Sequence, residues 1–219
     1  MASNECLITR VDLLRHGHCR DGEILRGTTD SLLSDNGWQQ MHQTVEPHND
    51  WQQIICSPLK RCHQFGQQLA QQLDIECSQV KGFREIDFGK WEGRLISDLW
   101  QQEAELVGRY FAEPGSVTPQ GGESLSTANQ RVANAWQNML QQHRGQRLLI
   151  VTHGGTIRLL LAQLLSMPLA ALARLTVPYG SCTRVEIYHQ PDGDYPSLVS
   201  HNPAGLATPG QDTYGVSTG

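Results

Sequence analysis

The sequence contains no long hydrophobic run. A membrane-spanning helix needs about 20 consecutive apolar residues, whereas the longest candidate, Leu159–Leu165, is short and contains Gln163. The N-terminal stretch MASNECLITR also lacks the basic region and apolar segment of a secretory signal. We therefore expect a cytoplasmic protein that has no membrane partner.

Positive charge is also scarce. The 219-residue chain has 17 Lys and Arg residues against 22 Asp and Glu residues, which gives a net charge of −5. This balance argues against nucleic acid as a partner. A small anionic ligand remains possible, because a local group of arginines dominates the field within about 10 Å of itself.

Closely paired cysteines are absent, although the chain has six cysteines: Cys6, Cys19, Cys56, Cys62, Cys77 and Cys182. No two of them have the C-x-x-C spacing of zinc sites or thiol–disulfide motifs. We interpret them as free thiols, mostly buried, and expect neither a metal nor a cofactor. Cys19 stands out only because it follows His16 so closely.

Short apolar segments alternate with helical patterns. The segments Leu7–Leu14, Gln53–Cys56 and Leu148–Thr152 have the length and composition of buried strands. Helical patterns follow Ser34, Ser57 and Gly155, and another covers about residues 126–143. At the second helix, Ser57 is expected to be the N-cap and Pro58 the first helical residue.

This alternation predicts an α/β fold, a three-layer α/β/α domain with a largely parallel central sheet. Thr183–Tyr188 alternates in polarity and is expected to add a further strand. Residues 202–219 are small, polar and rich in Gly and Pro. We therefore expect one domain over residues 1–201 and a loosely ordered tail after it.

Charged side chains follow three of the predicted strands. Arg15 and His16 follow the first, Arg61 lies shortly beyond the second, and His153 follows the third. Ligands of open α/β sheets bind outside the carboxyl ends of the strands. We therefore expect these four side chains to meet at one end of the sheet.

Such a cluster suits phosphate. Guanidinium groups bind phosphate oxygens bidentately and stay charged at any working pH, and backbone N–H groups around Gly17 and Gly154 would add donors. A neutral imidazole can attack phosphorus, while the cations stabilise the transferred group. The residues predict phosphoryl transfer from a small phosphorylated substrate.

Transfer from an alcohol also needs a proton for the departing oxygen. Glu85 lies between Phe83 and Phe88, and a carboxyl group buried among apolar side chains holds a proton that it could donate. The residues alone do not distinguish Glu85 from Asp87 or Glu92 in this role.

Four motifs, in this order along the chain, resemble those of the histidine phosphatase, or phosphoglycerate mutase-like, superfamily. They are LLRHG (13–17), CSPLKRC (56–62), REIDFGKWEG (84–93) and VTHGG (151–155). The resemblance runs from near the start of the chain to about Tyr188, and it implies the phosphoglycerate mutase-like fold.

The resemblance also implies a role for each matching residue. His16 would be the nucleophile that becomes phosphohistidine, and Arg15, Arg61 and His153 would bind the phosphoryl group. Glu85 would be the general acid for the leaving alcohol and would then assist the attacking water. No metal is implied.

Within the family, three stretches are similar to α-ribazole phosphatases of cobalamin synthesis: residues 25–41, 121–132 and 160–187. By this resemblance Arg26, Gly27 and Thr28 would line the substrate side of the pocket. Mutases commonly have Arg and Asn where Ile86 and Gly155 stand, which favours a phosphatase.

Several alternatives stay open from the sequence. They are a broad-specificity phosphatase for small molecules, a sugar bisphosphatase, a phosphoglycerate mutase, and a phosphate-binding module without turnover. The intact His16, Arg61, Glu85 and His153 argue against the last of these. The sequence leaves the oligomeric state open.

Overall fold

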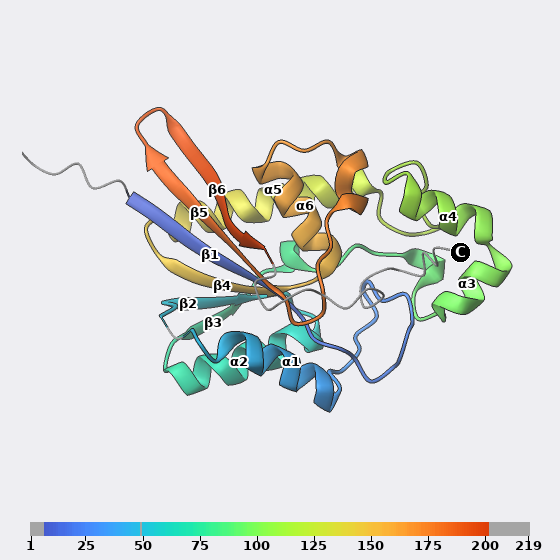
Figure 1. Cartoon of the computed structure of the whole chain (residues 1–219), viewed down its shortest axis with the longest axis horizontal. Coiled ribbons are helices and arrows are strands. Elements are labelled where there is room, and N and C mark those ends of the chain that lie inside the picture. The colour runs from blue at the N-terminus through green and yellow to red at the C-terminus, as the bar shows by residue number, and fades with distance from the viewer. Residues whose placement is uncertain (1–6, 49, 202–219) are drawn as a thin grey trace, which may run out of the picture.

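The computed structural model describes residues 7–48 and 50–201. A six-stranded sheet carries helices on both faces (Figure 1). The strands are β1 (Leu7–Arg15), β2 (Gln53–Cys56), β3 (Glu76–Gln79), β4 (Arg147–Thr152), β5 (Cys182–Gln190) and β6 (Gly193–His201). The α-helices are α1 (Asp35–Val45), α2 (Lys60–Leu73), α3 (Ile96–Gln102), α4 (Ala104–Ala112), α5 (Leu125–Gln142) and α6 (Gly154–Leu164), and the 3-10 turns are η1 (Lys81–Phe83), η2 (Gly89–Trp91) and η3 (Leu169–Arg174).

The strand order is β3-β2-β4-β1-β5-β6. β1, β2, β3 and β4 are parallel, whereas β5 runs antiparallel to β1, and β6 antiparallel to β5. The largely parallel sheet is therefore confirmed. β3 and β6 were not predicted, because edge strands need not carry the continuous apolar run of a buried parallel strand.

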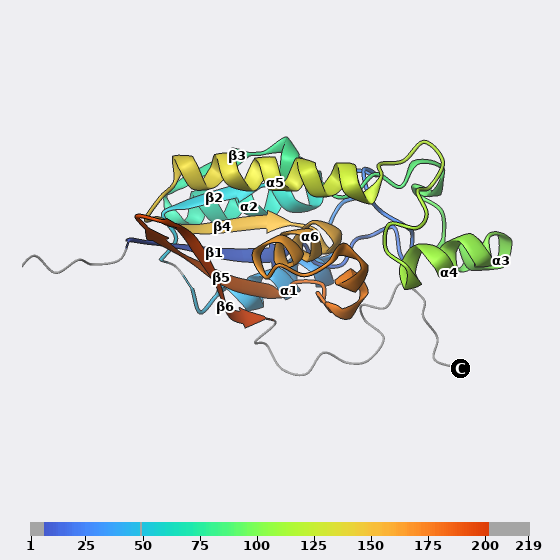
Figure 2. The same cartoon turned by 90° about the horizontal axis from the view of Figure 1, so that it is seen from above.

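Each face of the sheet has its own core. α1 and α2 cover one face, and α5 and α6 cover the other (Figures 1 and 2). Successive residues of a strand point to opposite faces, so Leu13 belongs to the core under α5 and α6 while Leu14 belongs to the core under α1 and α2. The three-layer α/β/α prediction is confirmed.

The predicted helices form, with one error at a boundary. α1 begins as expected, because the Ser34 hydroxyl accepts a hydrogen bond from the Gly37 amide at 3.0 Å. α2 begins at Lys60 after Leu59, so Ser57 is not its N-cap and Pro58 is not its first residue. The Ser57 hydroxyl instead lies 2.7 Å from Nε2 of His153.

An excursion between β3 and α5 was not predicted as helical. It contains α3 and α4, which project beyond the carboxyl ends of the strands (Figure 1). Within residues 7–48 and 50–201, no helix has both the length and the apolar character needed to cross a membrane. The predicted tail, residues 202–219, lies outside the described residues.

Asp12 links β1 to two neighbouring elements from inside the protein. Its side chain is 1% exposed and accepts hydrogen bonds from Arg184 Nε at 2.7 Å and from Trp51 Nε1 at 2.8 Å. Loss of this carboxylate leaves the buried Nε1 of Trp51 without its acceptor and Arg184, which is 24% exposed, without its counter-ion. This carboxylate therefore matters more for stability than the exposed acids of the same sheet.

We expect Asp12→Ala to lower the free energy of unfolding by about 2–4 kcal/mol, measured by urea denaturation, because it removes hydrogen bonds to a charged group and leaves a buried donor unpaired. The matched control is Asp50→Ala, because Asp50 also pairs with an arginine, Arg10, but is 46% exposed. That exposed pair should contribute no more than about 1 kcal/mol. Equal losses in the two variants would contradict this ranking.

Candidate active site

Four of the predicted side chains meet at the carboxyl ends of the strands. Arg15 ends β1, His16 follows it, His153 follows β4, and Arg61 lies in the first turn of α2. β1 and β4 are paired neighbours, and the rings of His16 and His153 lie 5.2 Å apart between centroids. All four residues are buried.

One ring nitrogen of His16, Nε2, has a free lone pair. The other, Nδ1, lies 2.8 Å from the carbonyl oxygen of Gly17, which can only accept, so Nδ1 carries the hydrogen. No other described residue forms a hydrogen bond with Nε2. Burial lowers the pKa of His16 well below its ordinary value, and the charges of Arg61 and Arg15 lower it further. The imidazole is therefore neutral, as a nucleophile requires.

Gly17 also has a structural role. A Cβ on Gly17 would lie 2.1 Å from the carbonyl oxygen of Gly37, so only glycine allows this close approach to α1. Of its two backbone polar groups, the carbonyl binds His16. The expected contribution of N–H groups near Gly17 to phosphate binding stays a prediction.

Arg61 is fully buried, and its hydrogen-bond partners in the described part of the chain are all neutral. Nη2 donates to the carbonyl of Gly27 and Nη1 to that of Thr29, both at 2.7 Å. Nε donates to Nδ1 of His153 at 3.2 Å. These bonds use three of the five guanidinium hydrogens and leave two for a ligand.

Glu92 fixes the two carbonyls that hold Arg61. Its carboxylate accepts hydrogen bonds from the amides of Thr28 and Thr29 at 2.9 Å, and from the amide of Gly27 at 3.2 Å. Burial alone would raise the pKa of Glu92, but hydrogen bonds from Thr29, Phe88 and Thr28 lower it. Sequence reasoning considered Glu92 only as a rival to Glu85 and missed this role, because no local pattern links it to residues 27–29.

His153 is held from both sides of its ring. Nδ1 accepts the hydrogen bond from Arg61, so the other nitrogen carries the hydrogen and donates to Ser57. Burial lowers the pKa of His153 well below its ordinary value, followed by the charge of Arg61. A direct contact between this imidazole and a phosphoryl group stays a prediction.

Arg15 is positioned by an aromatic ring and by the start of α6. Its guanidinium carbon lies 3.9 Å from the ring centroid of Tyr179, and Nη1 donates to the carbonyl of Val177. A Cβ on Gly154 would lie 3.2 Å from Nε of Arg15, so glycine gives the guanidinium room there. Tyr179 was missed, because its position in a loop before β5 carries no sequence signal.

Glu85 is buried as expected, but its surroundings differ from the expectation. The carboxylate accepts hydrogen bonds from the amides of Gly155 at 3.0 Å, and of Thr156 and Ile86 at 3.1 Å. Apolar side chains alone therefore do not enclose the carboxyl group, since the first turn of α6 supplies polar donors. The amides of Gly155 and Thr156 follow Gly154, in the region predicted to bind phosphate, but they donate hydrogen bonds to Glu85.

The predicted substrate-side residues form a supporting loop. Arg26 is buried, and donates from Nε to Ser31 at 3.0 Å and from Nη2 to the carbonyl of Gly22 at 2.7 Å. Gly27 offers its carbonyl to Arg61, and Thr28 is half-buried. Contact of these three residues with a substrate stays a prediction.

Cys19 lies beside the nucleophile. Its Sγ is 3.8 Å from Nδ1 of His16 and the side chain is buried. Burial raises the pKa of the Cys19 thiol, although the charges of Arg26 and Arg61 oppose this effect. The thiol is therefore protonated at neutral pH, which makes it a poor nucleophile.

An apolar cavity lies next to the cluster. Ile86 and Gly155, whose amides bind Glu85, belong to its wall. Aromatic and aliphatic side chains from α4, η3 and the neighbouring loops form much of the remainder: Phe88, Tyr110, Phe111, Leu125, Leu172 and Leu175. Arg158 adds the one basic side chain of the lining. The cavity can therefore hold a largely apolar or aromatic group beside the Glu85 carboxylate.

Comparison with protein families gives one match that covers most of the chain. The model described as Histidine phosphatase superfamily (branch 1) matches residues 11–200. This range contains the four motifs and the residues that form the cluster.

Individual relatives are similar at modest identity. The chain is 28% identical over 182 residues to the adenosylcobalamin/alpha-ribazole phosphatase of Salmonella typhimurium. The matched region covers 81% of this chain and 90% of the relative. It is 29% identical over 185 residues to the bifunctional protein Rv2228c of Mycobacterium tuberculosis, covering 82% of this chain and 50% of the relative. The chain thus spans about half the length of that mycobacterial relative. The structure of the alpha-ribazole phosphatase from Shigella flexneri superposes with a TM-score of 0.76 at 25% identity, covering 91% of this chain and 98% of that one.

The two neutral histidines predict how stability depends on pH. In the unfolded chain His16 and His153 bind protons below about pH 6.5, whereas in the folded protein they stay neutral to much lower pH. Proton uptake therefore favours unfolding. The free energy of unfolding should fall as pH drops below 6.5, by up to about 1.4 kcal/mol per pH unit for each histidine.

Urea denaturation in phosphate-free buffer between pH 7 and 5 measures this slope. His16→Asn should reduce the slope, because the titrating group is gone from both states. His63→Asn, which changes a histidine hydrogen-bonded to Gln79 outside the cluster, should leave it unchanged. An unaltered slope in His16→Asn would contradict the assignment.

Proposed function

Because the chain belongs to the histidine phosphatase superfamily (branch 1), we propose that it is a metal-independent phosphomonoesterase that works through a phosphohistidine. The observation that carries the proposal is the neutral His16 ring, held with Nε2 available beside the buried cation Arg61. The proposed substrate is α-ribazole 5′-phosphate or the corresponding cobalamin phosphate.

The first step transfers the phosphoryl group to the protein. Nε2 of His16 attacks phosphorus, the bond from phosphorus to the ester oxygen breaks, and Glu85 gives the departing alcohol a proton. The remaining hydrogens of Arg61, together with Arg15, offset the negative charge on the equatorial oxygens.

The second step returns the enzyme to its starting state. Water attacks the phosphorus of phosphohistidine, the bond to Nε2 breaks, and Glu85 takes one proton from the water. The hydrogen bond from Nδ1 of His16 to the Gly17 carbonyl supports the ring in both steps, since it fixes the tautomer. Inorganic phosphate leaves.

The cavity supports an alcohol with an aromatic group. An ester held by Arg61 with its leaving oxygen at Glu85 would place the rest of the alcohol near this cavity, because Ile86 and Gly155 both line the cavity and bind the Glu85 carboxylate. α-Ribazole carries an aromatic base on its ribose, which suits a wall of aromatic and aliphatic side chains. Glycerate and small sugars have little apolar surface to bury there. A broad-specificity phosphatase is the second candidate, because an apolar wall selects for shape less strictly than a polar one.

A substrate panel tests the proposal. Phosphate release is measured from α-ribazole 5′-phosphate and from sugar, nucleotide and phosphoglycerate esters, with and without a metal chelator. We expect activity to resist the chelator, the ribazole ester to be preferred about a hundredfold, and His16→Ala to abolish turnover while it leaves the thermal melt intact. A flat profile that His16→Ala abolishes would leave the broad-specificity phosphatase. No turnover on any ester would favour a binding module, and a His16→Ala variant with most of its activity would overturn the mechanism.

Tyr110 tests the cavity separately from the chemistry. Tyr110→Ala should lower kcat/KM for the ribazole ester by about tenfold and change it little for a small ester, since an aromatic pair contributes about 0.5–1.5 kcal/mol beyond its buried area. The control is Tyr195→Ala, because Tyr195 lies exposed on β6 and outside the cavity lining. Equal losses on both esters would mean that Tyr110 does not contact the alcohol.

A further inference from the structure

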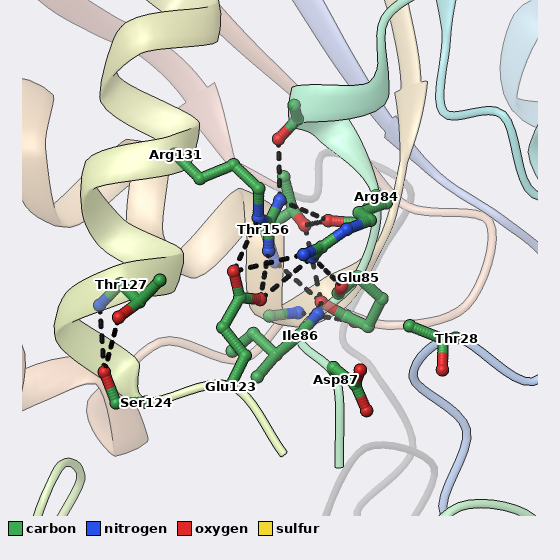
Figure 3. Close-up of polar contacts among 12 residues, drawn as sticks. Thr28, Arg84, Glu85, Ile86, Asp87, Glu123, Ser124, Thr127, Arg131 and Thr156 are labelled. Carbon is green, nitrogen blue, oxygen red and sulfur yellow. Dashed lines mark hydrogen bonds and ion pairs between the residues drawn. The ribbon is translucent and has the colours of Figure 1, made fainter. Parts of the chain in front are cut away.

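A partly buried ion cluster joins the start of α5 to the segment that carries Glu85 (Figure 3). The Glu123 carboxylate is 7% exposed and accepts hydrogen bonds from two arginines. Arg131 donates from Nε at 2.9 Å and from Nη2 at 2.7 Å, and Arg84 donates from Nη1 at 2.9 Å. Glu123 therefore fixes the orientation of the Arg131 guanidinium.

Arg131 also forms hydrogen bonds with the backbone on the N-terminal side of Glu85. Its remaining nitrogen, Nη1, donates to the carbonyl of Gly82 at 2.7 Å and to the carbonyl of Arg84 at 2.9 Å. The Thr156 hydroxyl also donates to the Arg84 carbonyl, at 2.9 Å. Glu85 is thus held by its preceding peptide group as well as by its own carboxylate.

Residues 122–123 contact the backbone on the C-terminal side of Glu85. The amide of Glu123 donates to the carbonyl of Asp87 at 2.8 Å. A Cβ on Gly122 would lie 2.7 Å from that carbonyl oxygen, so glycine allows the two backbone segments to come into contact. Residues 122–123 and Arg131 therefore brace the chain on both sides of Glu85.

Glu123 does not serve as a proton donor in this arrangement. Burial alone would raise its pKa, but the hydrogen bonds from Arg131 and Arg84 lower the pKa of Glu123 to about 2. The carboxylate is consequently charged throughout the working range of pH. Both of its oxygens accept hydrogen bonds from arginines (Figure 3).

We propose that Glu123 is a positioning residue, which acts through Arg131 to place the Glu85 carboxyl group at the leaving oxygen of the ester. The inference rests on the proposed function, in which Glu85 is the general acid. It adds that the efficiency of proton donation depends on an ion cluster that touches neither the phosphoryl group nor the alcohol.

The dependence on the leaving group tests this inference. A nitrophenolate leaves without help from an acid, whereas an alkoxide needs a proton. Turnover of p-nitrophenyl phosphate and of glycerol 2-phosphate is measured for the wild type, Glu85→Gln, Glu123→Gln and the double variant. Thermal melts report whether each variant is folded.

We expect Glu123→Gln to lower kcat for the alkyl ester by at least about tenfold, within the roughly 10²–10⁴-fold contribution of a general acid. The loss on the aryl ester should stay below about threefold, because the nucleophile and the phosphate contacts are unchanged. The double variant should be no slower on the alkyl ester than Glu85→Gln, because the two residues act as a unit.

Two further variants separate positioning from general stability. Arg131→Lys keeps a positive charge beside Glu123 but cannot reach both the carboxylate and the two carbonyls, so it should show the same selective loss. Glu103→Gln changes a carboxylate that pairs with Arg94 and Trp91 in another part of the chain, and it should show no selective loss.

The outcomes distinguish this inference from the proposed function. Equal losses on both esters in folded Glu123→Gln and Arg131→Lys, with a selective loss in Glu85→Gln, would overturn the positioning role alone. If Glu85→Gln itself lost activity equally on both esters, the acid assignment of the proposed function would fail, and this inference would fail with it. A selective loss in all three variants supports both.

Discussion

The site depends on a buried positive charge whose hydrogen-bond partners among residues 7–48 and 50–201 are all neutral. Arg61 has no exposed surface, and it donates to two carbonyl groups and one imidazole. Such a charge is costly to bury unless an ion of opposite sign completes its surroundings. The arrangement therefore favours an anion. Burial lowers the pKa of His16 most, and the Arg61 charge lowers it further, so the cation that favours phosphate also helps to keep the nucleophile unprotonated.

Two glutamates outside the reaction support opposite halves of this site, and both act through the backbone. Glu92 orients the carbonyls of residues 27–29, which hold Arg61. Glu123 orients Arg131, which holds the carbonyls on one side of Glu85. A carboxylate that accepts several hydrogen bonds can fix a loop more rigidly than apolar contacts do, because each bond has a preferred direction. The two halves are also joined, because Glu92 accepts a hydrogen bond from the amide of Phe88, next to the Asp87 carbonyl that the Glu123 amide binds.

The sequence predicted those parts of the molecule that follow a local pattern. Buried strands, amphipathic helices and the residues directly after strand ends were found, because each depends on a few neighbouring positions. Glu92, Glu123 and Tyr179 were not assigned, since their partners lie far away in the chain. Ser57 was assigned wrongly for a related reason: a serine before a proline resembles a helix cap, and only the fold reveals that its hydroxyl faces His153. Local propensity was outweighed there by a tertiary hydrogen bond.

The arrangement of the cavity separates the chemistry from the choice of alcohol. The residues proposed to hold and attack the phosphoryl group sit at strand ends and helix starts, whereas α4, η3 and loops supply most of the cavity wall. Loop-borne walls can change without disturbing the phosphate site. Ile86 and Gly155 are the exception, because they belong to the wall and also bind the Glu85 carboxylate. A change there would alter selectivity and proton transfer together, so the alcohol pocket can vary freely only on the side away from Glu85.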